Sequence, residues 1–341
     1  MKHLFSRFSL FAVLLVAVFL ATPAHAQGLF DLIGSLTGNQ SDAKPSVSYL
    51  EGDKNAADEI LLIRIRGVIT EPDDGDSTMP FDVKKSMIDR VKKEIDTAIE
   101  RPQIKAVLLE VDSPGGEITA SDILHHQLSR LKASKKPMVA LIGSLGASGG
   151  YYTACAADQI WAHPTSIIGS IGVIMRSMNM EKLASTIGIK AVTLISDRTP
   201  KKDLFSPFRE MTPEEKAMLL SIVDSSYDRF VEIVAAARKK SIKDITTLAD
   251  GGIFTSKQAL DKGLIDGIGY REDAIVKACD LAGIKTSKLV RRKARRSIGE
   301  LISEFAEMHS GAPALLSRLE TLIQTSGTSK ILFQMPGIGN E

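Results

Sequence analysis

Residues 105–116 read Lys-Ala-Val-Leu-Leu-Glu-Val-Asp-Ser-Pro-Gly-Gly, an apolar run that ends in a proline and two glycines. Lys105 to Val111 has the length and composition of a buried strand, and Asp112 to Gly116 breaks it. A helical pattern follows at Thr119 to Leu131, and another strand at Met138 to Ile142. Because strand, helix and strand alternate, we predict an α/β fold with a mostly parallel sheet covered by helices.

The same periodicities extend this alternation in both directions along the chain. Further strands are predicted at Ile60 to Ile69, Gln159 to Ala162, Ser166 to Met175 and Lys190 to Ile195. Further helices are predicted at Phe81 to Arg101, Thr212 to Lys240, Ser256 to Lys262 and Glu272 to Leu281. Thr212 before Pro213 has the residue types of a helix N-terminus.

Length and charge limit the class of protein. The chain has 341 residues, 44% hydrophobic content and a formal net charge of +2. This length suits one catalytic domain with extensions. The small net charge and the few aromatic residues make nucleic acid a poor candidate for a partner.

The N-terminus has the pattern of a secretory signal. Lys2 and Arg7 precede the apolar run Leu10 to Ala21, and Ala24-His25-Ala26 fits a cleavage site before Gln27. We therefore expect residues 1–26 to be a signal peptide, with a retained membrane anchor as the alternative. Either reading places the protein outside the cytoplasm, in the periplasm or on the periplasmic face of the inner membrane.

The segments beside the catalytic domain differ from it in composition. Residues 27–58 are rich in Gly, Ser and Asn, which predicts a flexible tether. Residues 286–341 form a C-terminal extension with the basic run Lys288 to Arg296 and amphipathic helices at Ile298 to Met308 and Pro313 to Ile323. The extension could pack on another subunit, on lipid or on its own domain.

The two cysteines argue against a metal site. Cys155 and Cys279 each lie in an apolar, helix-like context, which favours two buried free thiols over a disulfide. Two thiols without a histidine cluster cannot complete a tetrahedral zinc site, so we expect no structural metal and no cofactor.

Ser148 is the candidate nucleophile. It lies in Gly146-Ala-Ser-Gly-Gly-Tyr-Tyr152, among small residues between a strand-like and a helix-like run. A hydroxyl that attacks a carbonyl needs an open approach and a backbone amide for the developing oxyanion, which Gly149 offers. The alternative is a tight strand-to-helix turn whose small residues serve close packing.

The base that would activate this serine is less evident. His125, His126, His163 and His309 are the candidates outside the signal region, and His163 keeps a Ser-His-Asp triad open. The other route is a lysine whose pKa burial lowers toward neutrality. Lys202 fits this role best, although the residues alone favour the alternative that Lys202 and Lys201 are both solvated loop residues.

An ordered set of motifs identifies a family. Asp112-Ser-Pro-Gly-Gly116, Gly146-Ala-Ser-Gly-Gly-Tyr-Tyr152, Gly169-Ser-Ile-Gly172 and Lys202-Asp-Leu-Phe-Ser-Pro207 occur in this order. In them the chain resembles the short, single-unit form of the signal peptide peptidase A family, from about Ile60 to Ile275. The resemblance implies a serine peptidase domain over 59–285, with a fold shared with Clp protease and the crotonases.

The resemblance also implies the roles of individual residues. Ser148 corresponds to the nucleophile and Lys202 to the general base of a Ser-Lys dyad, Gly116 and Gly149 to the oxyanion amide donors, and Ser170 to a serine that hydrogen-bonds the lysine. Ser170 could also be a merely satisfied strand residue. The segment 198–200 and the residue at 205 depart from the glycine-containing pattern usual around the family's lysine.

The implied substrates are short apolar peptides, such as remnants of cleaved signal sequences, bound in an extended conformation by strand addition. The chain has no Walker-type phosphate-binding motif, so we expect it to act on peptides or already extended segments. The resemblance further implies a homo-oligomer in which adjacent subunits share a site.

Three other readings remain open from the sequence. One keeps the chemistry but makes the protein a quality-control protease for membrane or misfolded envelope proteins. A crotonase-like acyl-CoA enzyme would use the same fold. The third is an inactive scaffold that binds peptides without cutting them.

Overall fold

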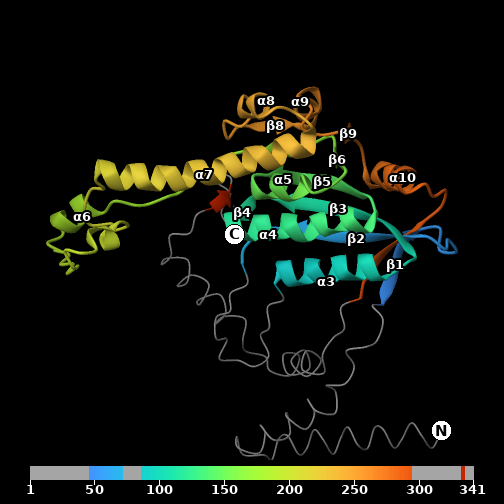
Figure 1. The fold of residues 1–341 in the computed structure, drawn as a ribbon, viewed down its shortest axis with the longest axis horizontal. Coiled ribbons are helices and arrows are strands. Elements are labelled where there is room, and N and C mark those ends of the chain that lie inside the picture. Colours follow the sequence, from blue (N-terminus) through green and yellow to red (C-terminus); the bar gives the residue numbers. More distant parts are fainter. Residues whose placement is uncertain (1–45, 72–85, 294–331, 335–341) are drawn as a thin grey trace, which may run out of the picture. The chain divides into compact units, whose positions relative to one another are not determined.

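The structure, a computed structural model, describes residues 46–71, 86–293 and 332–334; those from Val47 onward belong to one compact unit (Figure 1). Its main sheet has the strand order β1-β10-β2-β3-β5-β6-β9, with β7 beside β5 and β8 beside β7. The strands are β1 Val47–Gly52, β2 Glu59–Arg66, β3 Ile104–Ser113, β5 Met138–Ala147, β6 Gln159–Ala162, β7 Ile167–Gly169, β8 Ile253–Thr255, β9 Gly267–Ile268 and β10 Lys288–Arg292.

Most neighbouring strands of this sheet are parallel. β1 runs antiparallel to β10 and β8 antiparallel to β7, whereas the remaining pairs of the sheet are parallel. This arrangement confirms the predicted α/β fold with a mostly parallel sheet.

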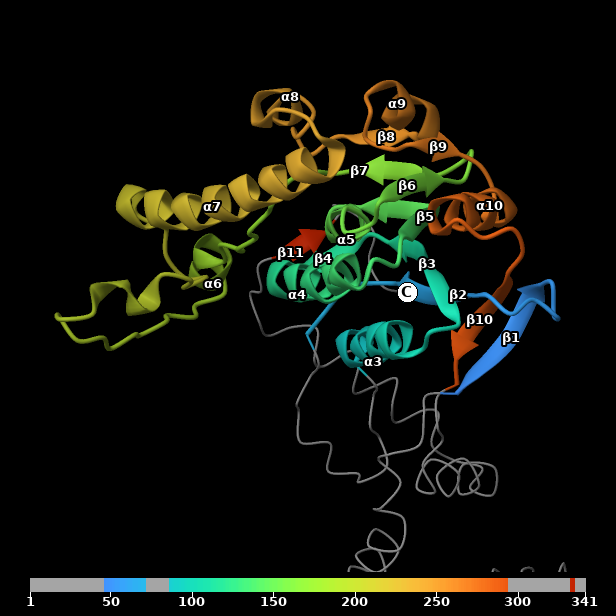
Figure 2. The same cartoon turned by 45° about the vertical axis from the view of Figure 1, so that its right-hand side comes forward.

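Both faces of the sheet are apolar, as parallel sheets require. Along β2, Leu61 and Ile63 join one core while Ile60 and Leu62 join the other, because successive side chains point to opposite faces. The first face is covered by α3 (Met87–Glu100), α4 (Ile118–Ser129), α5 (Gly149–Ala154) and α7 (Pro213–Arg238), and the second by α10 (Arg271–Ala282) (Figure 2).

The main predicted helices are confirmed. α3, α7 and α9 (Ser256–Asp261) fall within the predicted ranges, and the bounds of α4 and α10 differ from the predicted ones by one or two residues. α7 begins as predicted, since Thr212 Oγ1 accepts a hydrogen bond from Glu215 N, the Glu215 carboxylate accepts one from Thr212 N, and Pro213 occupies the first turn. α8 (Ile242–Thr246) was not predicted.

Two strand predictions are wrong in extent or in kind. The strand predicted at 166–175 is only Ile167–Gly169, because Ser170 adopts a φ of 49° that no strand residue has. Residues 190–195, predicted as a strand, are exposed and pair with no other strand of the described chain. Alternating apolar residues form a strand only where a neighbouring strand accepts their hydrogen bonds.

Residues 174–212, which we call the arm, connect the sheet to α7. The arm contains α6 (Glu181–Thr186) and the 3₁₀ turn Pro200–Asp203. In Figures 1 and 2, α6 lies at the N-terminal end of α7, away from the strands.

The sheet includes residues on both sides of the predicted catalytic domain. β1 lies within the predicted tether 27–58, and β10 lies within the predicted extension 286–341. The predicted signal peptide and the helices predicted at 298–308 and 313–323 lie outside the described residues. Within the described ranges, no helix is both long and apolar enough to cross a membrane.

Replacing Phe230 tests the contact between α7 and α5. Phe230 is fully buried, and its ring centroid lies 5.1 Å from that of Tyr152. We expect Phe230→Ala to lower the free energy of unfolding by about 3–5 kcal/mol, because it leaves a cavity in the core. Val276→Ala, on the exposed face of α10, should change it by less than about 0.5 kcal/mol. Denaturant unfolding measures both; equal effects would contradict this packing.

Candidate active site

Ser148 occupies a strained turn between β5 and α5. Its φ of 51° and ψ of −123° are rare for a residue other than glycine, and such backbone costs about 1–3 kcal/mol. Two backbone hydrogen bonds hold the turn, from Ser148 N to Gly169 O at 2.8 Å and from Tyr152 N to Ser148 O at 2.9 Å. Strain of this kind persists where the surrounding structure fixes it, which is common at catalytic residues.

The glycines after Ser148 permit close contact with a second backbone segment. A Cβ atom on Gly149 would lie 2.3 Å from Ser121 Oγ and 3.3 Å from Gly116 N. A Cβ on Gly150 would lie 2.6 Å from Ser113 O. The small residues of this turn therefore allow close packing, which was the alternative interpretation of the motif. The same packing brings the backbone of Gly149 against that of Gly116.

Gly116 lies in the short strand β4 (Gly115–Glu117), which is bonded along one edge to Ile69. Ile69 N donates to Gly115 O at 2.9 Å, and Glu117 N donates to Ile69 O at 2.8 Å. Because successive strand residues direct their amides to opposite edges, the N–H of Gly116 points away from Ile69. A Cβ on Gly116 would lie 1.9 Å from Ile69 O, so only glycine fits.

The other edge of β4 is paired with an extended segment of the same chain. β11 (Leu332–Gln334) runs antiparallel to β4, with Phe333 opposite Gly116. The edge toward which the Gly116 amide points therefore accepts an extended backbone.

Ser170 lies beside the nucleophile. It is buried, and it follows Gly169, whose carbonyl accepts the hydrogen bond from Ser148 N. Its own backbone N–H donates to Gly252 O at 2.7 Å, which fixes the positive φ. The structure thus brings together four of the predicted site residues, Ser148, Gly149, Gly116 and Ser170.

Lys202 is not brought to this group within one chain. It lies in the 3₁₀ turn of the arm and is exposed. Among the described residues, no hydrogen bond joins Lys202 to Ser148 or Ser170. Lys201, its neighbour, is also exposed.

Arg209 holds the lysine-bearing turn against α7. Its Nε donates to Asp203 Oδ2 at 3.0 Å and its Nη2 to Asp203 O at 2.7 Å. The same guanidinium donates to both carboxylate oxygens of Glu215, at 2.7 and 2.8 Å. These hydrogen bonds lower the pKa of Glu215 to about 2. The residue after Lys202 is therefore fixed even though Lys202 itself is exposed.

The described histidines have other partners. Burial lowers the pKa of His125 to about 4, and its ring packs edge-on against Tyr152 at 5.3 Å. His163 Nδ1 lies 2.9 Å from Thr165 Oγ1, and its ring packs against Tyr270. No hydrogen bond joins any histidine of the described ranges to Ser148. His126 is exposed, and His309 lies outside those ranges.

Both cysteines are free thiols. Cys155 is buried, which raises its pKa to about 12, and Cys279 is half-buried with its Sγ 3.2 Å from Ser287 Oγ. Across the part of the chain that the structure describes, no three His, Cys, Asp or Glu side chains are grouped so that they could hold a metal ion.

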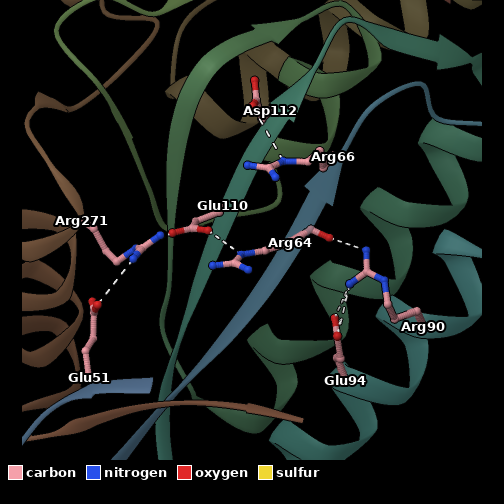
Figure 3. Close-up of polar contacts among 8 residues, drawn as sticks. All are labelled: Glu51, Arg64, Arg66, Arg90, Glu94, Glu110, Asp112 and Arg271. Carbon is pink, nitrogen blue, oxygen red and sulfur yellow. Dashed lines mark hydrogen bonds and ion pairs between the residues drawn. The ribbon is translucent and has the colours of Figure 1, made fainter. Parts of the chain in front are cut away.

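Charged side chains pair across β2 and β3 (Figure 3). Arg64 pairs with Glu110 at 2.8 Å, and Arg66 faces Asp112 at 3.9 Å. Asp112 Oδ1 also accepts a hydrogen bond from Leu145 N at 3.2 Å. The sequence places Asp112 in a strand-breaking motif that is also part of the family resemblance, and no local pattern signals its bond to the neighbouring strand.

Comparisons with known proteins find peptidases. The family model described as "Peptidase family S49" matches residues 130–285, which contain Ser148, Ser170 and Lys202. A protein of Synechocystis sp. named as a candidate protease is 40% identical over 191 residues, which are 56% of this chain and 68% of that protein. A protein of Enterococcus faecium named as a candidate signal peptide peptidase SppA is 35% identical over 225 residues, 66% of this chain and 63% of its own length.

Among solved structures, the chain is similar to a ClpP1 mutant from Listeria monocytogenes. The TM-score is 0.40 with 15% sequence identity, and the similarity covers 63% of this chain and 94% of that one.

The lowered pKa of Glu215 predicts how acid affects the base of the arm. A carboxyl group whose pKa falls from 4.5 to about 2 on folding stabilises the fold fully above pH 4.5 and loses that effect as the pH falls through 2. We expect Glu215→Gln to lower the melting temperature at pH 7, with a difference from the parent that shrinks between pH 4.5 and 2. Thermal scans at several pH values measure this.

Glu214→Gln, in the same first turn of α7, is the matched control, because no described ion pair involves Glu214. If the melting temperatures of the Glu215→Gln variant and the parent stayed equally far apart at every pH, the ion pair with Arg209 would not account for the effect.

Proposed function

Because this chain belongs to peptidase family S49, we propose that it is a serine endopeptidase with Ser148 as nucleophile and Lys202 as general base. The observation that carries the proposal is the contact between the strained Ser148 turn and β4, which sets the Gly149 backbone against the Gly116 amide. Two converging N–H groups beside a serine suit an oxyanion intermediate.

The proposed reaction uses groups of the chain alone. Ser148 Oγ attacks the peptide carbonyl carbon while neutral Lys202 takes the hydroxyl proton, and the amides of Gly116 and Gly149 bind the negative oxygen. The C–N bond then breaks as Lys202 returns the proton to the leaving amine. Water hydrolyses the resulting ester by the same route, which frees the carboxylic product and restores Ser148. Ser170 orients the Lys202 amine.

The substrate is an extended, apolar peptide that pairs with β4 along the edge that β11 occupies in this structure. Support comes from β11, whose antiparallel pairing shows that this edge of β4 fits an extended backbone. Signal peptide remnants are the proposed physiological substrates, since a relative of 35% identity carries the signal peptide peptidase name. The N-terminal signal pattern supports action in the periplasm or on the periplasmic face of the inner membrane.

Catalysis requires a second copy of the chain. A lysine acts as a general base where burial lowers its pKa, yet Lys202 is exposed and lies on the arm. The arm also exposes many large apolar side chains: Met178, Leu183, Ile187, Ile189, Val192, Leu194, Ile195, Phe205 and Phe208. Leu194 is 93% exposed. A homo-oligomer that covers these residues would bury Lys202 beside the Ser148 of a neighbour.

The dyad is tested by hydrolysis of a fluorogenic apolar peptide by the full chain. Ser148→Ala and Lys202→Ala should each lower kcat/KM by about 10³-fold or more, because each removes a group that moves in the first step. Lys201→Ala is the matched control and should retain activity. Hydrolysis by Ser148→Ala at the parent rate would refute the peptidase site.

Mixing the two inactive variants tests the shared site. If Ser148 and Lys202 come from neighbouring copies, equal amounts of Ser148→Ala and Lys202→Ala, coassembled after dissociation, should recover about one quarter of the parent activity. Each recovered site then has an intact serine from one variant and an intact lysine from the other. An inactive mixture whose co-assembly is verified by native mass spectrometry would place both groups in one chain.

A further inference from the structure

Ser113, the last residue of β3, has a fully buried hydroxyl that makes two hydrogen bonds. Its Oγ donates to Gly67 O at 2.7 Å and accepts from Gly115 N at 3.1 Å. The side chain therefore connects the segment after β2 with the first residue of β4. A buried hydroxyl that both donates and accepts is fully satisfied here, and alanine would leave both partners without it.

The segment after β2, to which Ser113 bonds at Gly67, also sets the orientation of β4. Gly67 N donates to Asp112 O at 3.0 Å, and two residues later Ile69 bonds to both ends of β4. These bonds assign Gly115 and Glu117 to the Ile69 edge and leave the Gly116 N–H for the opposite edge. The Ser113 hydroxyl bonds to both sides of this connection, to Gly67 and to Gly115, the residue directly before Gly116.

Ser113 also touches the nucleophile turn. A Cβ atom on Gly150 would lie 2.6 Å from Ser113 O and 3.2 Å from Ser113 Cβ. The pairing of β3 with β5 is irregular at this point, since Val111 pairs with Ile142 but Ser113 pairs with Gly146. An irregularity of this kind interrupts the ladder of backbone bonds, so side-chain bonds must fix the local direction of the strand.

We infer that Ser113 is a positioning residue of the oxyanion hole. Its hydroxyl fixes Gly115 relative to Gly67 and so aims the Gly116 amide at the oxyanion that forms when Ser148 Oγ attacks the carbonyl carbon. The inference rests on the proposed function, because it assigns Ser113 to the same site. It needs no contact between Ser113 and the substrate, since the hydroxyl acts through the backbone of β4.

Ser113→Ala in the full chain tests this inference. Losing one oxyanion donor lowers kcat by about 10²–10³-fold, so misdirecting one should lower kcat by about 10- to 100-fold. KM should stay within about twofold, because the donor binds the transition state rather than the substrate. The affinity for a peptide boronate, which mimics the tetrahedral intermediate, should fall by the same factor as kcat/KM.

Thr97→Val is the matched control, because it removes another buried hydroxyl bond, from Thr97 Oγ1 to Lys93 O at 2.8 Å on α3. It should lower thermal stability without changing kcat. If Ser113→Ala does not fold, Ser113→Cys is the second variant, since a thiol of similar size is a weak hydrogen-bond partner. Its kcat should fall below that of the parent by about 10- to 100-fold, with KM unchanged.

A parent-like kcat in a folded Ser113 variant would overturn the inference. A loss of activity no larger than the loss of folded protein would also overturn it. So would an affinity for the boronate that stays at the parent value while kcat falls. These results differ from failure of the proposed function, which would appear as hydrolysis by Ser148→Ala whatever Ser113 does.

Discussion

The structure depends on the close approach of two backbone segments, which leave little room between them for a Cβ atom. One is the turn that carries Ser148 and Gly149; the other is β4 with Gly116. A Cβ atom added to Gly149 would lie 3.3 Å from both Gly115 Cα and Gly116 N. In the proposed mechanism an amide of each segment binds the oxyanion that forms at the Ser148 hydroxyl, as acyl transfer requires. Without these two amides, Ser148 would be a buried polar residue with no group to stabilise an oxyanion.

The parallel sheet produces this approach. β3 and β5 are neighbours and run in the same direction, so the segments after them, 112–116 and 146–150, meet at one edge. Burial on both faces fixes the two strands, and α7 packs on α5 behind the turn. The arm has no such support from the core. Arg209 fixes the turn of Lys202 to α7, whereas the apolar residues around it remain exposed.

The sequence predicted those parts of the fold that local patterns determine. Helices with clear spacing and caps, such as α7 after Thr212, were predicted close to their bounds. β1 and β10 were not, because short strands with charged residues become strands only through partners far along the chain. At the site, Ser148 and its glycines follow from the motifs. Ser113 and Arg209 do not, since their roles depend on hydrogen bonds to other segments that no spacing records.

The central claim is that the amides of Gly116 and Gly149 receive the oxyanion of a substrate bonded to Ser148. A crystal structure of the assembled protein with a peptide boronate tests it most directly. The account predicts a covalent bond from Ser148 Oγ to boron, with one boronate oxygen within hydrogen-bond distance of both Gly116 N and Gly149 N. A boronate bonded to another residue, or one whose oxygens point away from both amides, would contradict the account.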